Sequence, residues 1–170
     1  MSLCIYYVIK IPVASNNTSS QMSQLQNAAN TENSITFNQP VQPIPVTGTT
    51  VKYYNKKELA PLIVITKSDG TNYLIKVLDW NTKNPILTTF IRSGETASLK
   101  VPLGSYEIRY ATGEMWYGYD YLFGPATSYY KADSRMDFTQ SGNIYKGHTI
   151  ELIPRVSGNL QTINISKDNF

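Results

Sequence analysis

Aromatic side chains gather in one part of this 170-residue chain. Nine of the twenty-five positions from Tyr106 to Tyr130 are Tyr, Trp or Phe, although aromatic residues make up only 12% of the chain. Tyrosine and tryptophan combine a rigid apolar ring with a polar tip, which is why they are enriched on recognition surfaces. We therefore predict a binding site for a protein or a glycan here, formed by Trp116, Tyr117, Tyr119, Tyr121, Tyr129, Tyr130 and Arg135.

Much of this segment is expected to form one long loop, because the strand before it should end near Ala111. The density of rings argues for a loop that is ordered by its own packing, with turns at Gly113, Gly118 and Gly124-Pro125. We expect the edge of this binding site to carry hydrogen-bonding side chains, from Glu114, Asp120, Lys131, Asp133 and Arg135. The alternative is that the rings cap the open end of a β-sandwich. We favour this structural role for Trp116 and Phe123, and expect at least two exposed rings among Tyr117, Tyr119, Tyr121 and Tyr129.

Catalytic chemistry has little support in the sequence. A glycosidase needs two carboxyl groups about 5–10 Å apart, and the spacing of Glu114, Asp120, Asp133 and Asp137 permits such a pair without indicating it. The single cysteine, Cys4, and the single histidine, His148, lie far apart in the chain, so neither a Cys/His protease nor a zinc site is expected. Glycine-rich phosphate loops and a Gly-x-Ser-x-Gly motif are both missing. We expect no cofactor.

The charge distribution argues against nucleic acid as a partner. The net charge is +3, and the longest basic run is Lys56-Lys57, whereas nucleic-acid binding usually concentrates positive charge in a stripe or an arm. No stretch of about 20 apolar residues is present, so the sequence predicts no membrane-spanning helix.

From position 51 onward, short apolar runs alternate with turn signals every 8–12 residues or so, which is typical of an all-β sandwich or barrel. The clearest alternation puts Tyr106, Ile108 and Tyr110 on one face of a strand, which we assign to the core. Glu107 and Arg109 then belong on the other face, as surface positions. We predict a single antiparallel β-sandwich of immunoglobulin-like or transthyretin-like type.

Three segments make up the chain in this interpretation. Residues 1–14 are either a leader or a first strand, because the apolar run Ile5-Tyr6-Tyr7-Val8-Ile9 suits both. Residues 15–50 form a polar tether that ends in a spacer containing Pro40, Pro43 and Pro45. The alternative is that this extension packs along the domain. Residues 51–170 form the sandwich domain.

Two patterns resemble known families. The stretch Val101-Pro102-Leu103-Gly104-Ser105-Tyr106 resembles a hairpin of carboxypeptidase-regulatory-like and transthyretin-like sandwiches. Together with Ala111-Thr112-Gly113-Glu114-Met115-Trp116-Tyr117-Gly118, Leu122-Phe123-Gly124-Pro125 and Gly158-Asn159-Leu160, it makes residues 61–165 similar to a group of uncharacterised bacterial proteins with one β-rich domain. This resemblance implies a bacterial or phage-borne chain, mildly favours export, and supplies no catalytic residue.

Together these features favour a non-enzymatic binding or structural module of the bacterial envelope or of a secreted assembly. The alternative is a phage or mobile-element protein that binds and modulates a host protein, and a glycan hydrolase ranks third. The expected location is periplasmic, envelope-associated or secreted, with the cytoplasm as the alternative.

Overall fold

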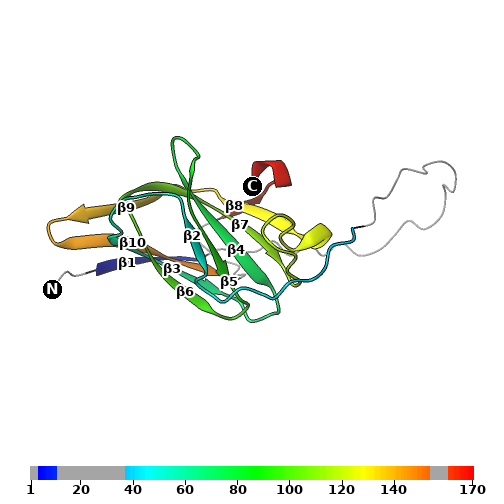
Figure 1. The fold of residues 1–170 in the computed structure, drawn as a ribbon. Helices are drawn as coiled ribbons and strands as arrows, with labels where there is room; N and C mark the ends of the chain where they lie inside the picture. Colours follow the sequence, from blue (N-terminus) through cyan, green and yellow to red (C-terminus); the bar gives the residue numbers. More distant parts are fainter. Residues whose placement is uncertain (1–3, 11–36, 154–160) are drawn as a thin grey trace, which may run out of the picture.

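The computed structural model describes residues 4–10, 37–153 and 161–170, and they form an all-β structure (Figure 1). No helix in these three segments has the length and apolar character needed to cross a membrane. Two short 3-10 helices, η1 and η2, accompany the strands. The elements are β1 (Cys4–Lys10), β2 (Thr50–Lys52), β3 (Ala60–Thr66), β4 (Asn72–Asp79), β5 (Pro85–Ile91), β6 (Thr96–Val101), β7 (Gly104–Gly113), η1 (Gly124–Ala126), β8 (Ser128–Ala132), β9 (Met136–Ser141), β10 (Ile144–Leu152), β11 (Thr162–Asn164) and η2 (Lys167–Asn169).

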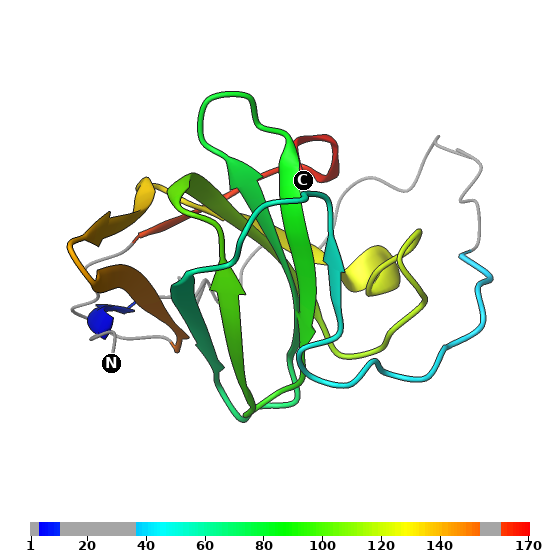
Figure 2. The ribbon, with the colours of Figure 1, turned by 60° about the vertical axis from the view of Figure 1, so that its left-hand side comes forward.

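The strands form one curled sheet in the order β2-β5-β4-β7-β9-β10-β3-β6, with β1 beside β10, β8 beside β7 and β11 beside β8. Strand β10 runs parallel to both β1 and β3, so the sheet is mixed and the predicted purely antiparallel arrangement is wrong. The curl brings β3, β6 and β10 over the layer of β5, β4 and β7, as in a half-barrel (Figure 2). The parallel pairs join segments far apart in the chain, and no turn signal in the sequence marks such a pairing.

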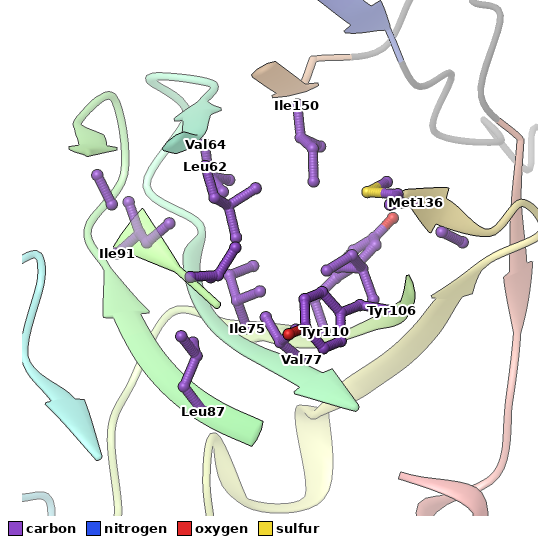
Figure 3. Close-up of a cluster of buried hydrophobic side chains, with 14 of the residues drawn as sticks. Leu62, Val64, Ile75, Val77, Leu87, Ile91, Tyr106, Tyr110, Met136 and Ile150 are labelled. Carbon is purple, nitrogen blue, oxygen red and sulfur yellow. The ribbon is translucent and has the colours of Figure 1, made fainter. Parts of the chain in front are cut away.

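The inner core fills the space enclosed by this curl. Figure 3 shows side chains from β3, β4, β5, β7, β9 and β10 converging there. The predicted face of β7 is confirmed, because Tyr106, Ile108 and Tyr110 are all buried in this core. The other main members are Leu62, Val64, Ile75, Val77, Leu87, Ile91, Met136, Phe138, Ile150 and Leu152.

Strand β7 corrects the prediction for its opposite face. Glu107 was expected at the surface, but it is only 5% exposed. Its carboxylate accepts hydrogen bonds from Lys83 Nζ at 2.5 Å and from Arg109 Nε at 2.6 Å. Because β7 is an inner strand of the sheet, neighbouring side chains cover its outer face, and a charge there needs partners.

The turn between β6 and β7 connects two parts of the sheet and is not a hairpin. Strand β6 pairs with β3, and β7 pairs with β4, β8 and β9, so no described pairing joins β6 to β7. The Tyr106 hydroxyl donates to the Pro102 carbonyl at 3.1 Å and ties the two ends of this corner together. A Cβ atom on Gly104 would lie 2.9 Å from that hydroxyl, so the corner needs glycine there. The predicted strands are present, but the predicted hairpin pairing is wrong.

Two predictions concern the chain before β2. Residues 4–10 form a strand, β1, as in one of the two interpretations of the N-terminal apolar run. Residues 37–49, here called the strap, lie against the domain, as in the alternative to a free proline spacer. The backbone amide of Gln42 donates to the Trp116 carbonyl at 2.8 Å, and Arg92 Nε donates to the Pro45 carbonyl at 2.8 Å. Of the tether predicted over residues 15–50, residues 15–36 fall outside the described residues.

Candidate functional site

A second cluster of buried side chains covers the outer face of β4, β5 and β7. It consists of Leu74, Phe90, Ala111, Trp116, Leu122 and Phe123, and is called the aromatic cluster here. The Trp116 ring meets the Phe90 ring edge-on at 5.0 Å between centroids and the Phe123 ring at 5.3 Å. Both Trp116 and Phe123 are 2% exposed, so their predicted burial is confirmed.

The loop of residues 114–127 is ordered by contacts of its own and by the strap. The Tyr117 amide donates to the Leu122 carbonyl, and the Leu122 amide donates to the Gly118 carbonyl, both at 2.7 Å. Gly118 has a φ of +90°, which side chains rarely allow, so this tight turn depends on glycine. The strap and this loop lie on the same side of the molecule (Figure 2).

Next to the aromatic cluster lies a cleft of about 320 Å³, here called the aromatic cleft. Four rings from distant parts of the chain contribute to its wall, and two of them, Tyr119 and Tyr129, belong to the predicted site. Tyr119 is 50% exposed, and its ring stands edge-on against Trp116 at 5.3 Å, so a buried residue supports an exposed one. The lining residues are Val51, Tyr53, Leu74, Lys76, Thr88, Tyr119, Asp120, Leu122, Tyr129, Lys167 and Phe170.

Charged groups lie among these rings. Lys76 Nζ donates to the Phe170 carbonyl at 2.7 Å and lies 4.1 Å from the centre of the Phe170 ring. Burial lowers the pKa of Lys76, and the nearby charge of Arg109 lowers it further. Lys167 and Asp120 supply one further charge of each sign. The cleft can therefore pack the flat face of a ligand against rings and bind its polar groups at the edges.

The other predicted site residues lie outside the aromatic cleft. Tyr117 is buried and packs edge-on against Phe37 at 5.0 Å, and Tyr121 is 44% exposed beside the same ring at 5.9 Å. Tyr130 stacks on Tyr110 at 5.0 Å and therefore faces the inner core. Arg135 precedes β9 and pairs with Asp137 at 3.0 Å.

Strand alternation explains why Tyr129 and Tyr130 separate. Both belong to β8, and successive side chains of a strand point to opposite faces of the sheet. The prediction treated them as one surface, which the structure contradicts. Two of the four tyrosines expected to include exposed rings are exposed, Tyr119 and Tyr121.

The acidic residues considered for catalysis do not all line the aromatic cleft. Among the residues that line the aromatic cleft, Asp120 is the one with a carboxylate side chain. Glu114 lines a different pocket with Met115 and Phe123, and Asp137 accepts a hydrogen bond from the Ser105 hydroxyl at 2.6 Å. In the described part of the chain, no group of three or more histidine, cysteine or acidic residues is arranged to hold a metal ion.

The side chain of His148 lies outside the aromatic cleft and makes contacts with β9. Its ring packs edge-on against Phe138 at 4.7 Å, and its Nε2 lies 2.9 Å from the Asp137 carbonyl oxygen. Burial lowers its pKa, which keeps the imidazole neutral near pH 7.

Sequence reasoning missed most of the lining of the cleft, including Tyr53, Lys76, Lys167 and Phe170. Lys76 carried a signal, since it is the one charge within Leu74-Ile75-Lys76-Val77-Leu78, a run otherwise suited to a buried strand. Tyr53 and Phe170 carried none, because only the folded sheet brings residues 53, 76, 129 and 170 together. Comparisons with protein-family models, with curated proteins and with solved structures found no match for this chain.

Proposed function

We propose that this protein is a non-enzymatic binding module that holds a protein or glycan partner in the aromatic cleft. The observation that carries the proposal is the exposed Tyr119 ring, held against buried Trp116 at the mouth of a cleft with further rings and charges. An exposed ring of this kind contributes its apolar area on association, whereas a core ring contributes it on folding.

The size of the cleft narrows the kind of partner. At about 320 Å³ it lies at the small end of ligand pockets, so it suits one ring-sized group. A sugar unit of a glycan or an aromatic side chain of a protein fits this description. Lys76 and Lys167 outnumber Asp120, which favours a partner with acidic groups next to that ring.

The proposal includes a location and a finer fold assignment. A place at the bacterial envelope or in a secreted assembly rests on the sequence resemblance, and cell fractionation tests it. An immunoglobulin-like assignment is supported by the Tyr106–Pro102 contact, which has the geometry of a tyrosine corner, and by the crossovers from β3 to β4 and from β6 to β7.

The test of function screens the purified chain against an array of bacterial and host oligosaccharides, and against cell extracts in a pull-down. For any probe retained, Tyr119→Ala is expected to weaken binding by about 1–2 kcal/mol, with folding unchanged. The matched control is Tyr121→Ala, because Tyr121 is similarly exposed but lies outside the cleft. If no probe is retained, or if both variants lose binding equally, the cleft is not the binding site.

A further inference from the structure

The two ends of the curled sheet face each other across a second cavity. Strands β2 and β6 terminate the strand order, and within the described residues no strand pairs with the outer edge of either. A cavity of about 500 Å³, here called the edge groove, is lined from both ends, by Thr50 and Lys52 of β2 and by Ser98, Leu99 and Lys100 of β6. The remaining apolar lining residues are Pro61, Ile63 and Leu87, of which Ile63 is the most exposed.

The register shows which backbone groups of β6 face this groove. In an antiparallel ladder, alternate residues direct both of their backbone polar groups to the same neighbour. The Thr66 amide donates to the Glu95 carbonyl at 3.2 Å, and the pairing of Leu62 with Leu99 continues that ladder. By alternation, Leu99 points its amide and carbonyl toward β3, and Ser98 and Lys100 point theirs away from β3.

The same reasoning applies to β2. The Tyr53 amide donates to the Ile86 carbonyl at 2.9 Å, and Val51 pairs with Thr88 in the same ladder. Thr50 and Lys52 therefore direct their backbone groups away from β5. The four residues with outward-facing backbone groups, Thr50, Lys52, Ser98 and Lys100, all line the two sides of the groove, together with Leu99.

From this geometry we infer that the edge groove takes one extended strand of a partner protein, which pairs with β6 on one side and with β2 on the other. Sheet edges of this kind bind peptides by strand addition, with affinity from backbone hydrogen bonds and specificity from alternate side chains. Alternate side chains of that strand would lie on the two faces of the sheet, beside Leu99 on the inner face and on the side of Ile63 and Ser98 on the outer face.

The charged side chains of the edge groove indicate which residues the bound strand carries. Lys52 and Lys100 lie on opposite sides of the groove, and Glu58, bonded to Lys52 at 2.6 Å, is the one carboxylate among its lining residues. The local excess of positive charge favours a strand with an acidic side chain at its centre. This site is separate from the aromatic cleft, so either proposal can fail without the other.

The probe is a fluorescein-labelled nine-residue peptide in which threonine and valine alternate and the central threonine is replaced by glutamate. Fluorescence anisotropy measures its binding to the full chain. A control peptide with lysine in place of the glutamate is expected to bind at least fivefold more weakly. In the variant Lys100→Ser, the difference in affinity between the glutamate peptide and the lysine peptide should become smaller.

The decisive variant is Ser98→Pro. Proline removes the amide that faces the groove and leaves the ladder to β3 intact, so the chain should fold and bind the peptide at least tenfold more weakly. Ser98→Ala keeps that amide and should bind like the parent chain. Thermal melts of both variants report whether they fold.

Hydrogen exchange on the parent chain provides a measurement that needs no variant. The peptide should slow exchange of the Ser98 and Lys100 amides and leave the Leu99 amide, already directed toward β3, unchanged. Absence of binding up to millimolar peptide, or equal binding by Ser98→Pro and Ser98→Ala, overturns the proposal. So does a dimer of the free chain that Ser98→Pro dissociates, because the groove would then belong to a second copy.

Discussion

The two faces of the β5-β4-β7 layer are packed by different means. The inner face is covered by strands of the same sheet, mostly through aliphatic side chains such as Leu62 and Ile150. The outer face is covered by a loop, through the rings of Trp116 and Phe123. The inner core is therefore formed by strands with alternating apolar residues, and the outer core by a loop rich in aromatic residues. That loop also places the Tyr119 ring at the surface.

Tyrosine hydroxyls sharpen this contrast. On the inner face, burial raises the pKa of Tyr73 to about 12, and the charge of Asp69 adds to that rise. On the outer face, Tyr119 and Tyr121 keep about half of their surface in water. The inner tyrosines thus act as core residues, and the outer ones are available to a partner.

Removing Trp116 is the strongest test of the outer core. Trp116→Ala should lower the free energy of unfolding by about 3–5 kcal/mol, because the ring is 2% exposed and touches Phe90 and Phe123. Urea denaturation measures this change. Met115→Ala, at a 55% exposed neighbour, is the control and should change stability by about 0.5 kcal/mol or less. A loss below about 1 kcal/mol for Trp116→Ala would show that the aromatic cluster does not unfold together with the sheet.

Ile108 tests the inner core in the same way. Ile108→Ala should cost about 2–5 kcal/mol through lost burial and an unfilled cavity, since the side chain is 2% exposed. Ile163→Ala, at a 49% exposed position of β11, is the matched control. Equal losses in the two variants would contradict the assignment of the core face of β7.

Glu107 tests the charged part of the outer face. Burial acts to raise the pKa of Glu107, but hydrogen bonds from Lys83 and Arg109 outweigh it and leave the pKa below its usual value. Glu107→Gln should therefore cost about 1–3 kcal/mol at pH 7.

The effect of pH on this difference has a defined sign. Because the folded-state pKa is depressed, the carboxylate stabilises the fold above the unfolded value of about 4.3, and this contribution is lost as the pH falls through the folded value. The parent chain and Glu107→Gln should thus begin to converge in denaturation experiments as the pH falls below the unfolded value of about 4.3. A gap that stays constant down to pH 3 would mean that packing, and not charge, accounts for the loss.

The smallest effect is expected at the corner before β7. Tyr106→Phe removes the hydroxyl that donates to Pro102 and should cost about 0.5–1.5 kcal/mol. Thermal denaturation measures this loss. The control is Tyr121→Phe, at a 44% exposed ring, which should leave the melting temperature unchanged. If the Tyr106 variant is also neutral, the hydroxyl does not stabilise the connection between the two parts of the sheet.

The sequence predicted what depends on local periodicity. The alternation around Tyr106, Ile108 and Tyr110 identified a core face, and the ring density around Trp116 identified buried aromatics. It did not predict the burial of Glu107, because that depends on Lys83, which reaches it from the turn between β4 and β5. The parallel neighbours of β10 and the contribution of Phe170 to the cleft depend on long-range pairing in the same way.

The parallel pairing of β10 with β3 also sets the order of events during synthesis. Leu62 to Thr66 are synthesised 86 residues before their partners His148 to Leu152, a delay of about 4–17 s at elongation rates of about 5–20 residues per second. Throughout that interval β3 can pair with β6, but its other edge has no neighbour from β10. The nascent chain is therefore exposed to intermolecular pairing at β3 until β10 has been synthesised, and chaperone binding at that edge would protect it.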